Sequence, residues 1–498
     1  MRSVLAWLLG LGVIAGVSAV ADPVEQQDAN PTVARVEPSP VATPAPTEPA
    51  KVGPAAPAPS ESPAPADEEK PAPLTLKVGS VEINPFGFVD LTAVYRSTNV
   101  GSGIGTSFGG IPFTSAGTAT GSVPTVAGNL GETKVSPQNS RLGLRATGKI
   151  GETKYTGYLE SDFLGFQVVN SQVTSNSYTF RIRNFFADIR SHSVELVAGQ
   201  AWTLMTPNRN GISPYTDDVF YGREMDTNYL AGLVWARQAQ VRLGVHINDN
   251  VAFAVAVENP QQFIGAAVVL PSALASTYGP QFDNNTTGNG TPNEAPDFTG
   301  KLAFDGGKDQ HFHFEVAGVV RSFKAFNPAN GGTTNSATGA AGSVGINFEL
   351  AKGFFLIGNG FTGKGGGRYI FGLAPDLIVN TDGTIQTLKS SSTVDGIELH
   401  VGNVWIYGYY SGVWIDQALT VDGKAGYGIT GAAGANHRIE EYSFGVNPTF
   451  WRDKDKKTSL GLITQYSYLK RTPWSVPANA PTSASTNMFY VDVRFTLP

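Results

Sequence analysis

Apolar and polar residues alternate with a period of two along most of the chain after residue 74. In the segment 140–150, Leu142 and Leu144 point to one side and Arg141 and Arg145 to the other. The same alternation recurs in 178–189, 239–247, 344–350 and 489–495. Strands with one apolar and one charged face predict a sheet that separates an apolar environment from an aqueous one.

The number of alternating segments predicts the fold. Bacterial single-chain barrels have an even number of strands. We therefore predict an all-β fold, a transmembrane antiparallel β-barrel of 16 strands, with 18 strands as the alternative. The expected strands are 82–95, 139–149, 153–163, 178–189, 193–200, 227–236, 238–247, 250–258, 297–304, 312–323, 341–350, 353–361, 394–401, 403–414, 441–450, 458–469 and 487–496.

The connections alternate between short and long, as in outer-membrane barrels. Short polar turns are expected at 149–154, 246–251 and 450–459. Long Gly-, Ser- and Thr-rich loops are expected at 97–138, 260–296, 324–340, 379–393 and 417–438. Aromatic pairs near strand ends are expected to form interfacial girdles, although a soluble barrel could also bury them. These are Phe185-Phe186, Phe354-Phe355, Tyr409-Tyr410, Phe450-Trp451 and Phe489-Tyr490, together with Trp405, Tyr407 and Trp414.

The N-terminal region lacks the alternating pattern. Residues 1–21 have a basic residue, an apolar run and a small-residue cleavage pattern, which predicts a signal peptide. Residues 22–73 are rich in Pro and Ala and cannot bury a core, so we expect a disordered periplasmic segment. The barrel is expected to occupy 74–498, because no other run of apolar residues is long enough for a membrane helix.

Net charge says little about the pore. The segment 22–73 contains nine acidic and three basic residues, so it accounts for the whole net charge of −6. The chain contains no Cys, which excludes a disulfide framework.

Charged residues on the inward face are the candidates for solute selection. A water-filled lumen would select solutes by its radius and its lining charges. Arginine offers a permanent charge and a planar fork to a carboxylate or phosphate. The candidate pore-lining residues are Arg141, Arg145, Arg181, Arg183 and Arg242.

These arginines could instead stiffen the barrel by pairing with Glu160, Asp162 and Glu349 on the same face. Both roles can coexist, because only an unneutralised excess of positive charge would set a preference for anions.

The segment 201–226 interrupts the strand pattern with prolines and glycines. We expect it to fold into the lumen as a constriction loop, although an ordinary external loop is the alternative. Its charged candidates are Arg209, Asp217, Asp218 and Arg223.

Other chemistry has weak support in the sequence. His311 and His313 share a strand face, but no third ligand stands at a metal-binding spacing. No nucleophile motif or phosphate-binding glycine loop is present, and no basic face predicts nucleic-acid binding. We therefore expect no enzyme activity, no metal, no cofactor and no nucleic-acid partner.

The stretch 139–247 resembles a known family. NSRLGLRATGKIGETKYTGYLESDFLG (139–165) resembles the early strands of Gram-negative porins. RIRNFFADI (181–189), VAGQAWTLM (197–205) and WARQAQVRLG (235–244) resemble the DcaP-type trimeric porins. The resemblance implies a 16-stranded trimer, a constriction loop and uptake of negatively charged small molecules such as dicarboxylates. It also implies that Arg181, Arg183 and Arg242 line the pore.

The sequence departs from that family at both ends. Family members are associated with an N-terminal coiled coil, whereas 22–73 has no heptads. Many porins end in an aromatic residue, whereas this chain ends in Phe495-Thr496-Leu497-Pro498.

The expected function is passive diffusion of small anionic solutes through a homotrimeric outer-membrane porin. Its partners would be the lipid bilayer and lipopolysaccharide of the outer membrane, with 22–73 in the periplasm as a candidate contact for peptidoglycan. Two alternatives remain open: a structural or adhesive barrel tethered to the cell wall through 22–73, and a barrel enzyme.

Overall fold

A computed structural model describes residues 75–165, 179–219, 222–225, 230–285, 291–307, 311–454 and 458–497. The expected signal peptide (1–21) and the Pro/Ala-rich segment (22–73) lie outside these residues.

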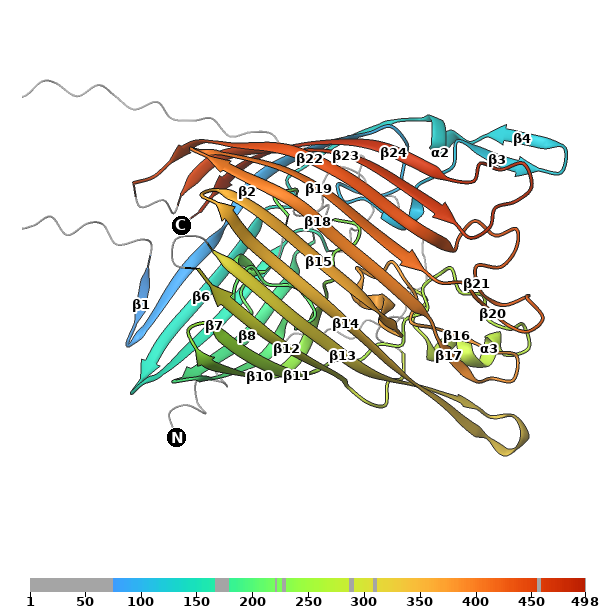
Figure 1. Ribbon diagram of the computed structural model, residues 1–498, viewed down its shortest axis with the longest axis horizontal. Helices are drawn as coiled ribbons and strands as arrows, with labels where there is room; N and C mark the ends of the chain where they lie inside the picture. The colour runs from blue at the N-terminus through green and yellow to red at the C-terminus, as the bar shows by residue number, and fades with distance from the viewer. Residues whose placement is uncertain are drawn as a thin grey trace, which may run out of the picture. The chain divides into compact units, whose positions relative to one another are not determined.

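Sixteen antiparallel strands form a closed barrel (Figure 1), as the alternation predicted. The barrel strands are β2 (Val81–Arg96), β6 (Arg141–Ile150), β7 (Thr153–Asp162), β8 (Arg181–Ser191), β9 (Val194–Trp202), β10 (Arg237–Asn248), β11 (Val251–Glu258), β12 (Asp297–Gly306), β13 (Phe312–Asn327), β14 (Thr333–Ala351), β15 (Phe354–Lys364), β18 (Lys389–Val401), β19 (Val404–Ile415), β22 (Asn436–Arg452), β23 (Ser459–Pro473) and β24 (Ala484–Thr496).

Strand β2 closes the barrel. Its second half pairs with β24, with Phe88 opposite Thr496 and Arg96 opposite Met488. Its first half pairs with β6, and the short strand β5 (Glu132–Ser136) takes the place of β6 beside its second half. The sheet therefore has no open edge between its first and last barrel strands, which lets every strand satisfy its backbone inside a membrane.

The two ends of the barrel differ in their connections. Tight turns at 151–152, 192–193, 249–250, 352–353 and 402–403 mark the turn end. Gly151, Gly353 and Gly402 have positive φ there, and His192 takes the same conformation at its turn. The other end, called the loop end below, carries most of the long connections, so it faces the cell exterior by the rule for outer-membrane barrels.

Short elements decorate the barrel. The strands are β1 (Leu76–Val78), β3 (Ser115–Thr118), β4 (Gly121–Pro124), β16 (Leu377–Val379), β17 (Ile385–Thr387), β20 (Ala418–Leu419) and β21 (Gly426–Tyr427). The helices are α2 (Val126–Asn129) and α3 (Ala275–Tyr278), with 3-10 turns η2 (Phe108–Gly110), η3 (Thr216–Asp218), η4 (Gly279–Gln281), η6 (Ala329–Gly331) and η7 (Gly367–Tyr369). Within the described part of the chain, no helix is long and apolar enough to cross a membrane.

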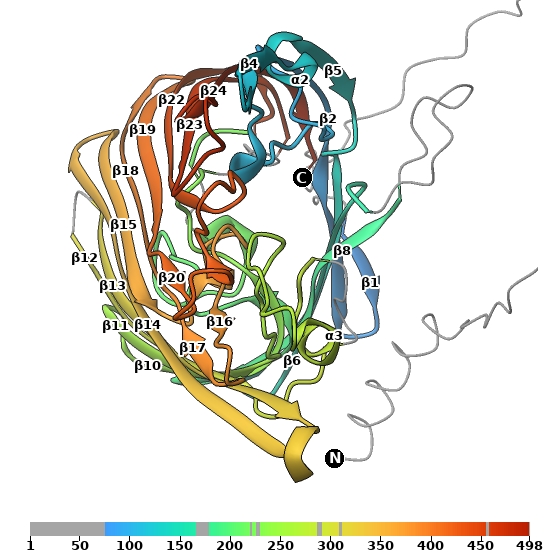
Figure 2. The same ribbon diagram turned by 90° about the vertical axis from the view of Figure 1, so that its right-hand side faces the viewer.

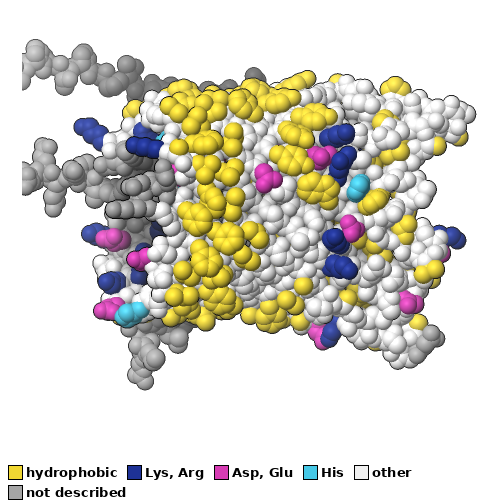
Figure 3. Space-filling view, in the orientation of Figure 1, with side chains coloured by type: hydrophobic (Ala, Val, Ile, Leu, Met, Phe, Trp, Pro, Cys, Tyr) yellow, Lys and Arg dark blue, Asp and Glu magenta, His cyan; other side chains and the backbone are white. Residues whose placement is uncertain are grey.

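The outer wall carries a belt of exposed apolar side chains (Figure 3). Leu142, Val241, Val255 and Val316 are each more than two-fifths exposed although they lie within strands. A soluble protein would bury such residues, whereas lipid accepts them. The barrel is therefore an outer-membrane barrel.

The aromatic pairs do not all form girdles as expected. Phe185 and Phe489 face outward, but their neighbours Phe186 and Tyr490 are buried inside the barrel. Tyr407 and Tyr409 also point inward. Successive residues of a strand point to opposite faces, so Phe185-Phe186 and Phe489-Tyr490 each supply one outward and one lumenal residue. Phe450 and Trp451 are both exposed, because the pairing of β22 shifts register between Thr449 and Trp451.

Loops fill much of the lumen at the loop end. In Figure 2, which looks into the barrel from this end, β16, β17 and β20 lie inside the ring of strands. Leu377 and Ile378 of β16 are fully buried. They belong to a large apolar cluster with inner-wall residues such as Phe361 and Ile439. The lumen is therefore less open than the alternation alone predicted, because inner-wall apolar positions near this end pack against loops.

Charged residues of the inner wall hold these loops. Arg96 Nη2 donates to the carbonyls of Ile104 and Gly105 at 2.8 and 2.9 Å. Arg321 Nη1 donates to Gly365 O at 2.6 Å. Arg471 Nη1 donates to Ala433 O at 3.0 Å. Loop carbonyls that would otherwise be unsatisfied inside the barrel thus gain charge-assisted partners.

Two expected boundaries were wrong. The segment 227–236 is not a strand: in its described part, 230–236, Leu230, Leu233 and Val234 are buried inside the barrel. Its apolar run packs a lumenal loop, which the alternation could not distinguish from a strand. The segment 324–340 is not a long loop, because β13 and β14 continue as a paired hairpin up to Asn327 and Thr333.

A charged side chain on the lipid-facing wall should destabilise the barrel. We expect Val255→Lys, in the middle of β11, to lower the free energy of unfolding by about 2–4 kcal/mol. Denaturant titration of the protein folded into bilayers would measure this, with Val255→Leu as the matched control. Equal stability of the two variants would show that this wall does not face lipid.

Candidate functional site

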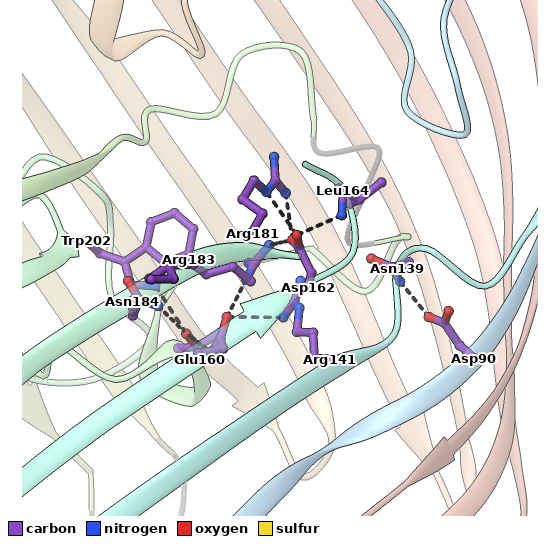
Figure 4. A network of polar contacts seen from close by, with 12 residues as sticks. Asp90, Asn139, Arg141, Glu160, Asp162, Leu164, Arg181, Arg183, Asn184 and Trp202 are labelled. Atoms are coloured by element: carbon purple, nitrogen blue, oxygen red, sulfur yellow. Dashed lines mark hydrogen bonds and ion pairs between the residues drawn. The ribbon is translucent and has the colours of Figure 1, made fainter. Parts of the chain in front are cut away.

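An ion-pair network lies on the inner wall at β7 and β8 (Figure 4). Arg181 binds Asp162 with both Nε (2.9 Å) and Nη2 (2.6 Å). Arg183 lies between two carboxylates: its Nε binds Glu160, and its Nη1 binds Asp162 Oδ2 at 3.0 Å. The side chain of Arg183 is 1% exposed and that of Arg181 is 37% exposed. The buried ion pairs of Arg183 therefore hold β7 and β8 together, while the side chain of Arg181 reaches the solvent.

A register shift in β8 creates this arrangement. The pairing of β7 with β8 slips between Glu160 and Ser161, so Arg183 and Asn184 are both buried in succession. A bulge of this kind reverses which residues face inward beyond it. The expected outward position of Phe186 was wrong for this reason.

Arg141 lies beside the network. Its Nη1 is 4.0 Å from Glu160 Oε1, and its guanidinium stacks 5.1 Å from the ring of Phe88. Glu349, the third carboxylate considered as a partner, is elsewhere: it accepts backbone N–H groups of His311 and Gly353 near the turn end.

Arg145 differs from these arginines because it makes no ion pair among the described residues. Its guanidinium lies 4.7 Å from the ring of Tyr215 and 5.5 Å from that of Tyr158. Tyr158 in turn stacks between Phe86 and Phe186, with ring centroids 5.1 Å apart on each side. Arg145 Nε has no hydrogen-bond partner. An aromatic frame therefore positions this cation without neutralising it.

Three further cations continue from Arg145 to the turn end on the same wall. Lys149 of β6 is opposite Lys154 of β7, and Lys154 is opposite Arg190 of β8. None of the three makes an ion pair within the described ranges. We call Arg145, Lys149, Lys154 and Arg190 the cation column.

Arg242 lies outside this column. It is only 2% exposed. Its Nε and Nη2 have no hydrogen-bond partner, and the charges that influence it come from Glu195, Asp188 and Glu258. The structure thus places Arg242 inside the wall packing rather than at a solvent-lined surface.

The segment between β9 and β10 folds into the barrel. The Met225 amide donates to Gln465 Oε1 of β23 at 3.1 Å, and the Ala231 amide donates to Glu441 Oε2 of β22 at 3.0 Å. These strands stand on the far side of the ring from β9 and β10. The segment therefore crosses the lumen.

One carboxylate anchors both limbs of this loop. Arg209 Nη2 lies 2.7 Å from Glu398 Oε1, and Arg223 Nε lies 3.0 Å from Glu398 Oε2. The Tyr409 hydroxyl also donates a hydrogen bond to Glu398 at 2.7 Å. Arg223 also stacks 3.7 Å from the ring of Trp405. These two loop arginines are thus engaged in holding the loop to β18 and β19.

The loop also touches the cation column. The Thr216 hydroxyl donates to Glu160 Oε2 at 2.6 Å, which brings Asp217 to a cavity of about 450 Å³ shared with Arg141 and Arg145. Asp218 lines a second cavity of about 600 Å³, also bordered by Arg145. Arg145 therefore lies between two cavities, each with a loop carboxylate on its lining.

The second cavity has both signs of charge. Arg145, Lys154 and Arg190 line one part of it. The acidic lining residues are Asp188, Glu195, Asp218, Asp249 and Asp305. Four of these have side-chain partners. Asp188 accepts from Tyr215 (2.6 Å), Glu195 pairs with His246 (2.9 Å), Asp305 accepts from the Gly211 amide (2.9 Å) and Asp218 accepts from Asn210 Nδ2 (3.4 Å).

The two candidate histidines have other partners. His311 Nε2 is 2.9 Å from Arg209 O, and His313 Nδ1 is 2.8 Å from Asp305 Oδ1. No cluster of metal-binding side chains occurs in the portion of the chain that the structure describes.

Several site residues were missed by sequence reasoning. Lys154 and Arg190 stand at strand ends next to turns, where alternation is weakest. Glu398 and Tyr215 come from a distant strand and from the loop, so only their contacts show their role. The inward direction of the Tyr158 side chain could have been predicted, because Tyr158 lies two residues before Glu160 and therefore on the same face of the strand.

Comparisons with known proteins support the fold. No protein-family model and no curated protein sequence matches the chain. Among solved structures, it is similar to the outer-membrane channel DcaP of Acinetobacter baumannii, with 16% identity, a TM-score of 0.57, and coverage of 84% of this chain and 99% of that one. It is also similar to the anion-selective porin from Comamonas acidovorans (13% identity, TM-score 0.46, coverage 84% and 100%) and to OmpT of Vibrio cholerae (11%, 0.44, 85% and 99%).

Because these sequence identities are low, the similarity shows a shared fold. The chain has a porin-like outer-membrane barrel fold of 16 strands.

Loss of the shared anchor should loosen the loop. We expect Glu398→Gln to raise the mean conductance and the open-channel noise, because breaking a buried ion pair costs about 3–5 kcal/mol. Planar-bilayer recording would measure both quantities. Glu440→Gln, which removes a carboxylate paired with Arg438 on β22, is the control; identical traces from both variants would contradict the anchoring role.

Asp217 should make selectivity depend on pH. It lies in the loop, outside the membrane-spanning strands, and burial raises its pKa above the ordinary value; Arg145 and Arg141 oppose that shift, while Asp218 and Glu160 add to it. Asp217 thus loses its charge at a higher pH than an aspartate with the ordinary pKa. We expect anion preference to increase from neutral to mildly acidic pH, measured as the reversal potential in a salt gradient. Asp217→Asn should show the higher preference already at neutral pH, and an unchanged pH profile in that variant would refute the assignment.

Proposed function

We propose that this protein is a porin for passive diffusion of small hydrophilic solutes across the outer membrane, with a preference for anionic ones such as dicarboxylates. The observation that carries the proposal is the cation column. Arg145, Lys149, Lys154 and Arg190 line one wall, and no carboxylate of the described residues lies within ion-pair distance of them. Unneutralised lumenal cations attract anions and repel cations.

The preference rests on these four residues more than on the other arginines. Arg181 and Arg183 share Glu160 and Asp162, so each of their positive charges faces a nearby negative charge. Such paired groups stabilise the wall and contribute little net field. Arg181 can still contribute to selectivity, because the solvent-exposed part of its side chain can contact a solute.

The cavities on either side of Arg145 support a solute path along this wall. A solute in the cavity of about 600 Å³ meets three cations on its lining, Arg145, Lys154 and Arg190. The carboxylates of Asp218 and Asp249 on the same lining would keep its residence short, since conduction requires weak contacts at several sites. The loop crossing the lumen would narrow this path.

The assembly and placement follow from the same proposal. The porin would act as a homotrimer, with the loop end toward the exterior and residues 22–73 in the periplasm. Conductance that increases in steps of three channels in planar bilayers would support the trimer. A barrel without conductance would contradict the proposed diffusion of solutes.

Neutralising Arg145 should weaken anion preference. We expect Arg145→Gln to reduce the anion-to-cation permeability ratio roughly fivefold, equivalent to about 1 kcal/mol for one charge close to the solute in water. The reversal potential in a salt gradient measures this ratio. Arg438→Gln, on the outer wall, is the matched control.

Substitution of an arginine that is already paired with carboxylates should have the opposite pattern of effects. Arg183→Gln should change the stability of the barrel more than its selectivity. If Arg145→Gln leaves the reversal potential unchanged while Arg183→Gln shifts it, the selective wall is the ion-pair network and not the cation column.

A further inference from the structure

A fully buried histidine lies between two carboxylates on the inner wall. His313 of β13 is 0% exposed. Its Nδ1 lies 2.8 Å from Asp305 Oδ1 of β12, and its Nε2 lies 3.3 Å from Glu315 Oε2 of β13. A carboxylate only accepts hydrogen bonds, and a neutral imidazole carries a proton on just one of its two nitrogens. Both contacts are therefore hydrogen bonds only when His313 is the doubly protonated cation.

The same two carboxylates hold the loop that crosses the lumen. The Gly211 amide donates to Asp305 Oδ2 at 2.9 Å, and the Asn208 amide donates to Glu315 Oε2 at 3.1 Å. Each carboxylate thus joins the imidazole to one backbone amide of the loop. We call His313, Asp305 and Glu315 the loop clamp, because they connect β12 and β13 to two points of the loop.

The two carboxylates depend on His313 to different degrees. Lys301 of β12 pairs with Glu315 at 2.8 Å, so Glu315 keeps a cation whatever the charge of His313. Among the described residues, His313 is the one basic side chain within ion-pair distance of Asp305. The attachment of Gly211 through Asp305 is thus the part of the loop clamp that relies most on the imidazolium.

Other charged and titratable groups lie around the loop clamp, and within the described ranges none of them makes an ion pair with His313. They are Lys301 on β12, His311 on β13, Glu349 on β14, Arg242 on β10, and Arg209, Asp218 and Asp249 on the connections. His311 Nε2 lies 2.9 Å from Arg209 O, and the Arg209 guanidinium pairs with Glu398. These groups therefore influence the charge of His313 without replacing its proton.

Loss of the His313 proton breaks one arm of the loop clamp. Histidine is the side chain whose charge changes nearest to neutral pH. In the neutral ring one nitrogen presents a lone pair to a carboxylate oxygen, so a hydrogen bond becomes a repulsive contact. A buried carboxylate that loses a donor is destabilised, and the loop amide bound to it is then held less firmly. The loop clamp is thus complete at lower pH and weakens as the pH rises.

We propose that His313 is a positioning residue for the loop that crosses the lumen, and that its proton determines how firmly residues 208–211 are held. With the proton in place, the loop is fixed at both amides and the lumen keeps one width. Without it, the loop moves between positions and the width fluctuates. The inference rests on the proposed function only in that the loop borders a conducting lumen, because the loop clamp itself can be tested without conductance.

Amide exchange in the full-length protein tests the loop clamp directly. Wild type and His313→Gln, both in lipid nanodiscs at about pH 6, would be compared by hydrogen-exchange mass spectrometry of the peptides that contain Asn208 and Gly211. We expect exchange at these amides to be about tenfold faster in the variant, because charge-assisted hydrogen bonds are lost. The matched control is His192→Gln, which changes an exposed histidine paired with Glu152 at the turn end and should exchange like the wild type.

A pH profile separates the proton from a purely structural effect of the side chain. In planar bilayers we expect the open-channel noise of the wild type to rise between about pH 6 and about pH 9, while His313→Gln is noisy throughout. Asp305→Asn keeps an acceptor for the Gly211 amide but removes the negative charge, so its pH response should be smaller than that of the wild type. This second variant decides the question if His313→Gln does not fold.

Three results would count against the proposal. Equal amide exchange in the wild type and His313→Gln would overturn it, and so would a pH-dependent noise profile that His313→Gln retains. Wild-type noise that stays constant over this pH range would overturn the role of the proton. A barrel without any conductance would contradict the proposed function, whereas the exchange result would still decide the loop clamp.

Discussion

The satisfaction of buried polar groups inside the barrel is the constraint on which the rest of this structure depends. The loops that enter the lumen bring backbone carbonyls and amides with them, and each needs a partner. The inner wall supplies these partners as charged side chains: Arg96, Arg321 and Arg471 bind loop carbonyls, while Glu258 and Glu441 accept loop amides. Much of the charge on the inner wall therefore has a structural task.

Because many charged residues of the inner wall bind loops, the number of inward charges does not by itself give the charge that a solute meets. Arg183 and Arg242 belong to the wall and Arg209 to the loop inside it, yet Arg183 and Arg209 pair with carboxylates and Arg242 is buried among acidic residues. The charge available to a solute is what remains after pairing. In this barrel that remainder lies on β6, β7 and β8, around Arg145 and toward the turn end.

The sequence predicted the architecture well because one wall of a barrel contacts lipid and the other does not. Sixteen of the seventeen expected segments correspond to barrel strands. The exception, 227–236, is apolar for a different reason: its described part packs against other loops inside the barrel. The segment between β9 and β10 contacts β22 and β23 inside the barrel, and its prolines and glycines disfavour a continuous strand.

The candidate site could be predicted only in part. Alternation by itself determined the closed antiparallel barrel, its lipid-facing belt and the inward phase of Arg141 and Arg145, because the period of two is a local property of each strand. Only the tertiary structure decided which inward charges are paired. That outcome depends on contacts between distant residues, such as Arg209 with Glu398, and on the bulge that reverses β8 beyond Arg183. Neither leaves a local pattern, since the partner of a charge is fixed by the register of the whole ring.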